Sequence, residues 1–126
     1  MVRFYKCAHC GSIVVKINDL GPVPSCCGEP MQEMRVGTTD GALEKHVPVV
    51  LEQGNKVLVK VGDVAHPMVE DHWIQWIYLL TDKGGTFHFL KPGDVPATTF
   101  VLDDDEVVLA VYEYCNKHGL YKANLD

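Results

Sequence analysis

Several features that define other protein classes are missing from this sequence of 126 residues. No apolar run approaches the ~18 residues that suggest a transmembrane helix, so we expect no membrane span. Residues 1–7 are polar and no cleavable apolar segment follows them, which argues against a signal peptide. The sequence has no internal repeat and no low-complexity tract. We therefore expect an ordinary globular, cytoplasmic protein.

Positive charge is also scarce, with eleven Lys and Arg against seventeen Asp and Glu. The deficit lies after residue 36, where seven Lys face fourteen acidic side chains and give that segment a charge of −7. Nucleic acid binding needs a basic patch, so no nucleic-acid partner is expected. An anionic substrate would have to be attracted by a local positive charge and not by the whole molecule.

Cysteine is present in an informative arrangement near the N-terminus. Cys7 and Cys10 form a Cys-x-x-Cys turn, and Cys26 and Cys27 are adjacent. In a reducing compartment such clusters bind metal more often than they form disulfides. Four thiolates make a tetrahedral site for iron or zinc, and the spacing leaves both metals open. A module of about 36 residues is too small for an adequate apolar core, so the metal is expected to hold it together.

Short runs of β-branched and aromatic residues, separated by turn-forming residues, predict an all-β chain. Strands are expected over residues 2–6, 12–17 and 30–36, and then over residues 46–51, 56–61, 73–80, 86–90, 98–102 and 107–114. A polar, glycine-bounded stretch at residues 37–41 predicts a boundary between domains 1–36 and 37–126. About seven short strands in the second domain predict an antiparallel, immunoglobulin-like β-sandwich. The run at residues 73–80 is apolar on both faces, which also permits a buried helix.

Histidine and cysteine indicate a second metal site in the second domain. His46, His66 and His72 each lie beside a turn, and Cys115 and His118 form a Cys-x-x-His turn near the C-terminus. A single histidine is more often a hydrogen-bonded or surface residue than a ligand, but four histidines at strand–loop edges, combined with a Cys-x-x-His turn, change that balance. Imidazole and thiolate together suit iron, copper or zinc. By contrast, His9 and His88 are expected to be surface or structural residues.

Five motifs in this order resemble the two-iron superoxide reductases, or desulfoferrodoxins. They are Glu44-Lys-His-Val-Pro48, Ala65-His-Pro-Met68, His72-Trp-Ile74, Leu90-Lys-Pro-Gly93 and Cys115-Asn-Lys-His-Gly119. The N-terminal cysteines are similar to the desulforedoxin-like module of that family. Each motif alone is weak, but the ordered set is specific and spans essentially the whole chain.

The resemblance implies two irons per chain and a role for each motif residue. Cys7, Cys10, Cys26 and Cys27 would bind a rubredoxin-like iron. His46, His66, His72 and His118 would be equatorial ligands of the catalytic iron, and Cys115 its axial ligand. Lys45 would attract superoxide and help deliver protons, and Glu44 would offer a carboxylate to ferric iron. The implied reaction is one-electron reduction of superoxide to hydrogen peroxide, with a rubredoxin-like electron donor and a homodimeric assembly.

Two positions depart from the family pattern, and two other functions compete with it. Asp71 replaces a frequent Lys before His72, which weakens the local positive field, and Tyr121 replaces a frequent Trp. A blue-copper-like electron carrier would use two His and one Cys with an axial Met, but this chain has two His too many and no Met shortly after His118. A zinc-stabilised binding module without redox activity would need only the N-terminal cysteines. Metal content separates these alternatives.

Overall fold

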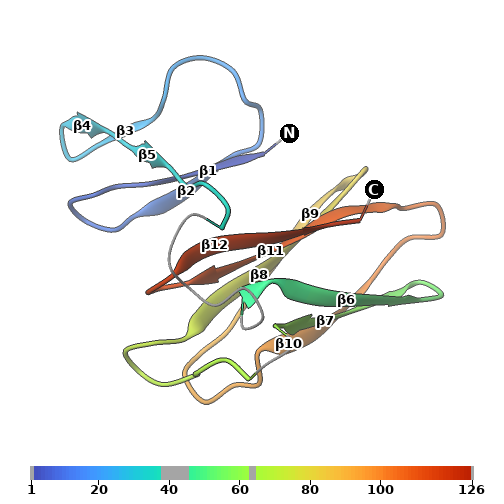
Figure 1. Cartoon of the computed structure of the whole chain (residues 1–126). Coiled ribbons are helices and arrows are strands. Elements are labelled where there is room, and N and C mark those ends of the chain that lie inside the picture. Colours follow the sequence, from blue (N-terminus) through green and yellow to red (C-terminus); the bar gives the residue numbers. More distant parts are fainter. Residues whose placement is uncertain (1, 38–45, 63–64, 126) are drawn as a thin grey trace. The chain divides into compact units, whose positions relative to one another are not determined.

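The computed structural model describes residues 2–37, 46–62 and 65–125 (Figure 1). The chain divides into two compact units, Met1–Arg35 and Val36–Asp126. The sequence had predicted a boundary between residues 36 and 37. Within the described ranges, no helix is long and apolar enough to cross a membrane.

The first unit is built from five short strands. They are β1 (Arg3–Lys6), β2 (Ile13–Lys16), β3 (Ser25–Cys26), β4 (Glu29–Pro30) and β5 (Gln32–Glu33). Antiparallel pairing gives a sheet of order β2-β1-β5 and a separate β3-β4 hairpin. The strands expected over residues 2–6 and 12–17 are present. The strand expected over residues 30–36 is broken into short pieces, because Met31 turns into the core and its N–H donates to Pro24 O at 2.8 Å.

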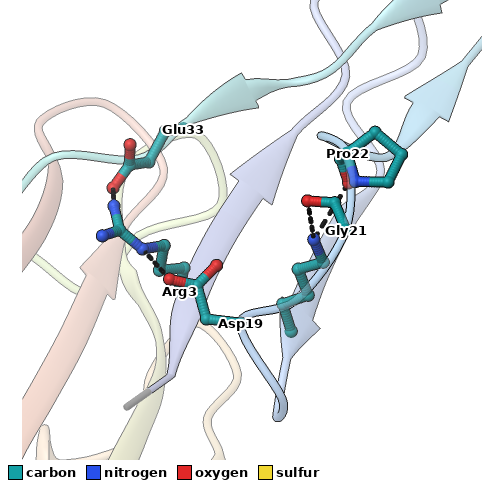
Figure 2. A network of polar contacts seen from close by, with 6 residues as sticks. Arg3, Asp19, Gly21, Pro22 and Glu33 are labelled. Atoms are coloured by element: carbon teal, nitrogen blue, oxygen red, sulfur yellow. Dashed lines mark hydrogen bonds and ion pairs between the residues drawn. The ribbon is translucent and has the colours of Figure 1, made fainter.

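Few apolar side chains are buried among the described residues of this unit. Its buried cluster consists of Tyr5, Cys7 and Met31, with Cys26 packed against it. Arg3 lies between Asp19 and Glu33, and its Nη1 is 2.7 Å from Glu33 Oε2 (Figure 2). Exposed ion pairs of this kind contribute only about 0–1 kcal/mol. The small core and the ion pairs therefore contribute little free energy of folding. A bound metal would supply the additional stability that so small a unit needs.

The second unit is a sandwich of two antiparallel sheets (Figure 1). The smaller sheet has the order β10-β7-β6, formed by Ala97–Val101, Lys56–Val61 and Pro48–Gln53. The larger sheet has the order β12-β11-β8-β9, formed by Gly119–Asn124, Val108–Cys115, Ile74–Thr81 and Gly84–Phe89. The predicted all-β, seven-stranded sandwich is confirmed. Residues 74–81 form a strand, so the helix alternative is wrong.

Strand β12 was not predicted, since the last strand expected from the sequence ends at residue 114. Its residues alternate weakly, and it is defined by pairing with β11, where Glu113 lies opposite Tyr121 and Cys115 opposite Gly119. Gly119 has φ = 88° and closes the tight turn between the two strands. This hairpin holds the Cys115-x-x-His118 turn at its tip.

The apolar character of β8 on both faces follows from its central position between β11 and β9. One face packs Ile77 and Leu79 into the sandwich core. The other carries Trp76 and Tyr78, and both are buried in an aromatic layer with Tyr114 and its neighbours. A strand buried on both faces loses the alternation that marks a half-exposed strand, which explains why its sequence looked ambiguous.

Candidate metal centres

The four N-terminal cysteines come from two tight turns. Cys7 directly follows β1, and Gly11 (φ = 78°) donates its N–H to Cys7 O at 3.1 Å, so the chain folds back around the sulfur. Cys26 ends β3, and Cys27 (φ = 53°) and Gly28 (φ = 77°) form the two-residue loop to β4. Positive φ at both positions is the signature of a type I′ hairpin turn. The adjacent cysteines, which are unusual for a zinc ribbon, thus result from a hairpin loop.

These four sulfur atoms lie within 4.8 Å of one another. Cys10 Sγ is 3.6 Å from Cys26 Sγ, which is 3.9 Å from Cys27 Sγ. A tetrahedron of sulfurs at about 2.3 Å from a central ion has edges of about 3.8 Å, so the arrangement fits a four-thiolate metal site. The backbone N–H groups of Cys10 and His9 lower the pKa of Cys7 to about 6, whereas the hydrogen bond with Cys10 raises the pKa of Cys26 to about 12.

His9 lies in the first turn but takes no part in the cysteine cluster. Its Nε2 is 2.9 Å from Glu29 Oε2 at the surface. This agrees with its expected place as a surface residue.

The second cluster is assembled at one end of the sandwich. His46 lies two residues before β6, His66 follows β7, and His72 lies two residues before β8. Cys115 ends β11 opposite Ile74, and His118 is in the turn that follows. Antiparallel pairing brings the start of one strand to the end of its neighbour, so residues up to 72 positions apart meet at this edge. The five ligand atoms lie within 4.8 Å of one another.

The four imidazoles form a closed ring of edge-to-face contacts. His46 contacts His66 and His118, and His72 contacts the same two. The ring centroids are 4.5–5.0 Å apart and the interplanar angles are 77–86°. Each ring therefore turns an edge toward a common centre, as four ligands around one ion would.

The nitrogen separations test this interpretation. His46 Nε2 is 2.9 Å from His66 Nε2 and 3.2 Å from His118 Nδ1. Neighbouring ligands in a square around an ion at about 2.1 Å would lie about 3.0 Å apart. His66 Nδ1 lies 2.7 Å from Pro67 O, so its N–H donates there and the Nε2 lone pair is left for the ion. Burial lowers the pKa of His66 to about 4, which keeps the ring neutral and able to bind.

Cys115 supplies the sulfur of this cluster from a fully buried position. Burial raises the pKa of its thiol, whereas the backbone N–H groups of Lys117 and His118 stabilise the thiolate. A coordinated cation deprotonates a thiol outright. Two N–H donors from the turn that also carries His118 thus favour the thiolate form, which is the form that binds a metal. The donor set of four imidazoles and one thiolate fits iron, copper or zinc.

Asn116 is a positioning residue that the sequence analysis missed. Its Oδ1 accepts the N–H of Trp73 at 2.9 Å, and its Nδ2 donates to Asp71 O at 3.0 Å. These two backbone groups flank His72. The side chain thus fixes the His72 segment to the residue next to Cys115. The Cys-Asn-x-His spacing was the available signal, but nothing in it pointed to a contact with residues 71 and 73.

We expect Asn116→Ala to weaken metal binding at the His/Cys cluster by about 10–100-fold, the usual effect of removing a partner that orients ligands. Loss of both hydrogen bonds frees the His72 segment. Asn116→Asp is the matched comparison, because it keeps an acceptor for Trp73 N–H but loses the donor to Asp71 O. Competition with a chelator gives the affinities. Equal affinity in Asn116→Ala and wild type would show that the contact does not position His72.

Tyr121 was noted in the sequence only as a departure from a family pattern. In the structure its ring stacks on His46, with centroids 4.6 Å apart and planes 21° from parallel. Both side chains are fully buried. Tyr121 therefore fixes the plane of His46 from outside the ring of histidines. Beside it, Glu113 is buried with no hydrogen-bond partner among the described residues, and burial raises its pKa to about 9.

Two predicted residues cannot be placed. Glu44 and Lys45 lie outside the described residues, so their expected roles stay predictions. His88, expected to be structural, is in β9, and its Nδ1 is 3.3 Å from Thr98 Oγ1. It is not part of either cluster of potential ligands within the described ranges.

Known proteins share both the sequence and the fold. The family described as desulfoferrodoxin matches residues 38–124. A desulfoferrodoxin from Nitratidesulfovibrio vulgaris is 53% identical over 121 residues, covering 96% of this chain and 94% of that protein. A desulfoferrodoxin homologue from Archaeoglobus fulgidus is 47% identical and covers 98% and 97%. The crystal structure of the superoxide reductase from Treponema pallidum aligns with a TM-score of 0.82 and 38% identity, covering 98% of this chain and 99% of that one.

Proposed function

The chain belongs to the desulfoferrodoxin family, and we propose that it is a superoxide reductase. One superoxide anion takes up one electron and two protons and leaves as hydrogen peroxide. The observation that carries this proposal is the closed ring of four histidines with Cys115 within 4.8 Å. A blue-copper-like carrier would need only two of these histidines.

Iron bound by His46, His66, His72, His118 and Cys115 would supply the electron for this reaction. The four imidazoles would hold the iron through neutral nitrogens, and Cys115 would add the one thiolate of the set. Thiolate ligation and its N–H donors tune the reduction potential of such a site. The contacts from Pro67, Asn116 and Tyr121 keep the ligand set in place while the oxidation state changes.

Glu44 and Lys45 precede His46 directly in the sequence, and we assign them to substrate handling. The ammonium group of Lys45 would attract the superoxide anion into a segment that carries a charge of −7. It would also hold the water that delivers protons to the reduced oxygen. The carboxylate of Glu44 would offer a hard oxygen ligand to ferric iron once the product has left.

Cys7, Cys10, Cys26 and Cys27 would hold the second iron in a rubredoxin-like site. A small rubredoxin-like protein would deliver electrons, and the chain would work as a cytoplasmic homodimer. Thiolate ligands favour a reducing compartment, which supports the cytoplasm. The overall role would be removal of superoxide under oxidative stress.

Metal analysis of protein purified without oxygen, followed by superoxide kinetics, tests the function. We expect about two irons per chain and second-order consumption of superoxide with hydrogen peroxide as product and no dioxygen. One iron with one zinc would keep the catalytic proposal and make the cysteine site structural. Copper, or zinc without iron, would exclude it.

A further inference from the structure

The outer face of the smaller sheet carries an apolar groove. Its described lining residues are Val49, Leu51, Leu58, Val59, Lys60, Val95, Ala97, Thr98 and Thr99, around a volume of about 550 Å³. Pairing places the outward side chains in rows, with Val49 and Ala97 on either side of Lys60, and Leu51 and Thr99 on either side of Leu58. Leu51 is 52% exposed and Val95 is 74% exposed. This is more exposed apolar surface than a sheet facing only water requires.

Charge on this face differs from charge on the rest of the unit. Lys56 and Lys60 project outward from β7, and no described residue lining the groove is acidic. The surrounding segment has twice as many acidic side chains as lysines. The face is therefore apolar and locally positive on an otherwise negative unit. Such a surface fits a partner with apolar and acidic groups.

A second copy of this chain fits the groove poorly. A two-fold symmetric pair would set the same face against itself and bring the same two lysines together. A third outward row consists of Gln53, Lys56 and Val101. From ordinary strand spacings, the three rows cover roughly 10 by 14 Å. This area is far below the ~800 Å² per partner that a stable dimer buries. Weak electron-transfer complexes have the smallest interfaces, so a small patch suits them better.

The groove also lies close to the His/Cys cluster. Val49 is three residues after His46, so their Cα atoms are at most about 10 Å apart. Val95 belongs to the loop after β9, in which Gly93 N–H donates to Met68 O at 2.8 Å. Met68 is two residues from His66. A protein seated on Val49, Lys60 and Val95 would thus stand beside two of the histidines.

We propose that this groove, centred on Lys60 and Leu51, is the docking surface for the electron donor, a small acidic one-electron carrier. This inference rests on the proposed function and names the surface through which the cluster is reduced. The donor is oxidised by one electron and the metal at the cluster is reduced by one. Superoxide reduction then uses that electron.

Lys60→Glu and Leu51→Gln test the surface in the full chain with both metal sites loaded. Reduced rubredoxin is the protein probe and ascorbate the small reductant, and stopped-flow absorbance follows reduction of the oxidised cluster. We expect each variant to slow reduction by rubredoxin about tenfold or more at low salt. Lys60→Glu should also flatten the dependence on ionic strength. Reduction by ascorbate should be unchanged, since a small molecule needs no docking surface.

Lys83→Glu is the matched control, because it makes the same charge change in the β8–β9 turn, at the other end of the sandwich. It should leave reduction by rubredoxin unchanged. Equal rubredoxin rates in wild type, Lys60→Glu and Leu51→Gln would overturn the proposal. So would sedimentation data in which Leu51→Gln splits a dimer without slowing rubredoxin, because the groove would then hold a second copy. Superoxide consumption by pre-reduced wild type tests the proposed function separately, since it needs no donor.

Discussion

Cys115→Ala is expected to abolish superoxide reduction, with the rate falling by more than about a hundredfold. Mutation of residues that only orient metal ligands already lowers metal affinity or activity by about 10–100-fold. Cys115 is itself a potential ligand and the one thiolate in the cluster. Its side chain is fully buried, and its sulfur receives two backbone N–H donors. Alanine removes the sulfur and leaves those donors without their acceptor.

Two measurements check this result. Pulse radiolysis gives the rate of superoxide consumption, and absorption spectroscopy of the oxidised protein should show loss of the thiolate-to-metal charge-transfer band. His88→Ala is the comparison, because His88 is a histidine of the same unit that lies in neither cluster. It should retain both rate and band. A Cys115→Ala protein with wild-type rate would mean that the sulfur is not a ligand.

Removal of the metal from the cysteine cluster is expected to unfold the first unit and leave the second folded. Among the described residues of the first unit, the buried cluster consists of Tyr5, Cys7 and Met31, with Cys26 against it, and Phe4 is also buried. Structural zinc in zinc-finger peptides contributes about 10–16 kcal/mol at neutral pH, which is as large as the whole stability of a typical domain. The second unit has its own sandwich core and does not depend on these sulfurs.

Cys10→Ser produces the metal-depleted first unit without a chelator, which would also attack the second site. Hydrogen exchange read by mass spectrometry should show residues 2–35 exchanging rapidly and the strands of residues 46–125 still protected. His9→Ala is the matched variant in the same turn, because His9 only pairs with Glu29 at the surface, and it should exchange like wild type. Protection of residues 2–35 in metal-depleted Cys10→Ser would show that the unit folds without metal.

Regular patterns in the sequence were sufficient for much of the fold. Alternating or β-branched runs predicted six of the seven strands of the sandwich. In a half-buried strand, successive side chains point to opposite faces, so apolar and polar residues alternate along the sequence. Strand β12 was not predicted, since it is defined by its pairing with β11 and not by alternation in its own sequence. The β3-β4 hairpin was also not predicted, because strands of two residues are too short to show an alternating pattern.

For the site, residue types alone were enough to predict which kinds of metal ligand the chain offers. Residue type decides whether a donor is a hard oxygen, an imidazole or a thiolate, so nine Cys and His side chains already limited the metals. How those donors come together depends on the packing of the strands. The edge-to-face ring of histidines, the Asn116 contacts around His72 and the Tyr121 stack on His46 join segments up to 75 residues apart. Such contacts depend on which strand ends the two sheets bring together, and that is a property of the packed sandwich that no single stretch of sequence contains.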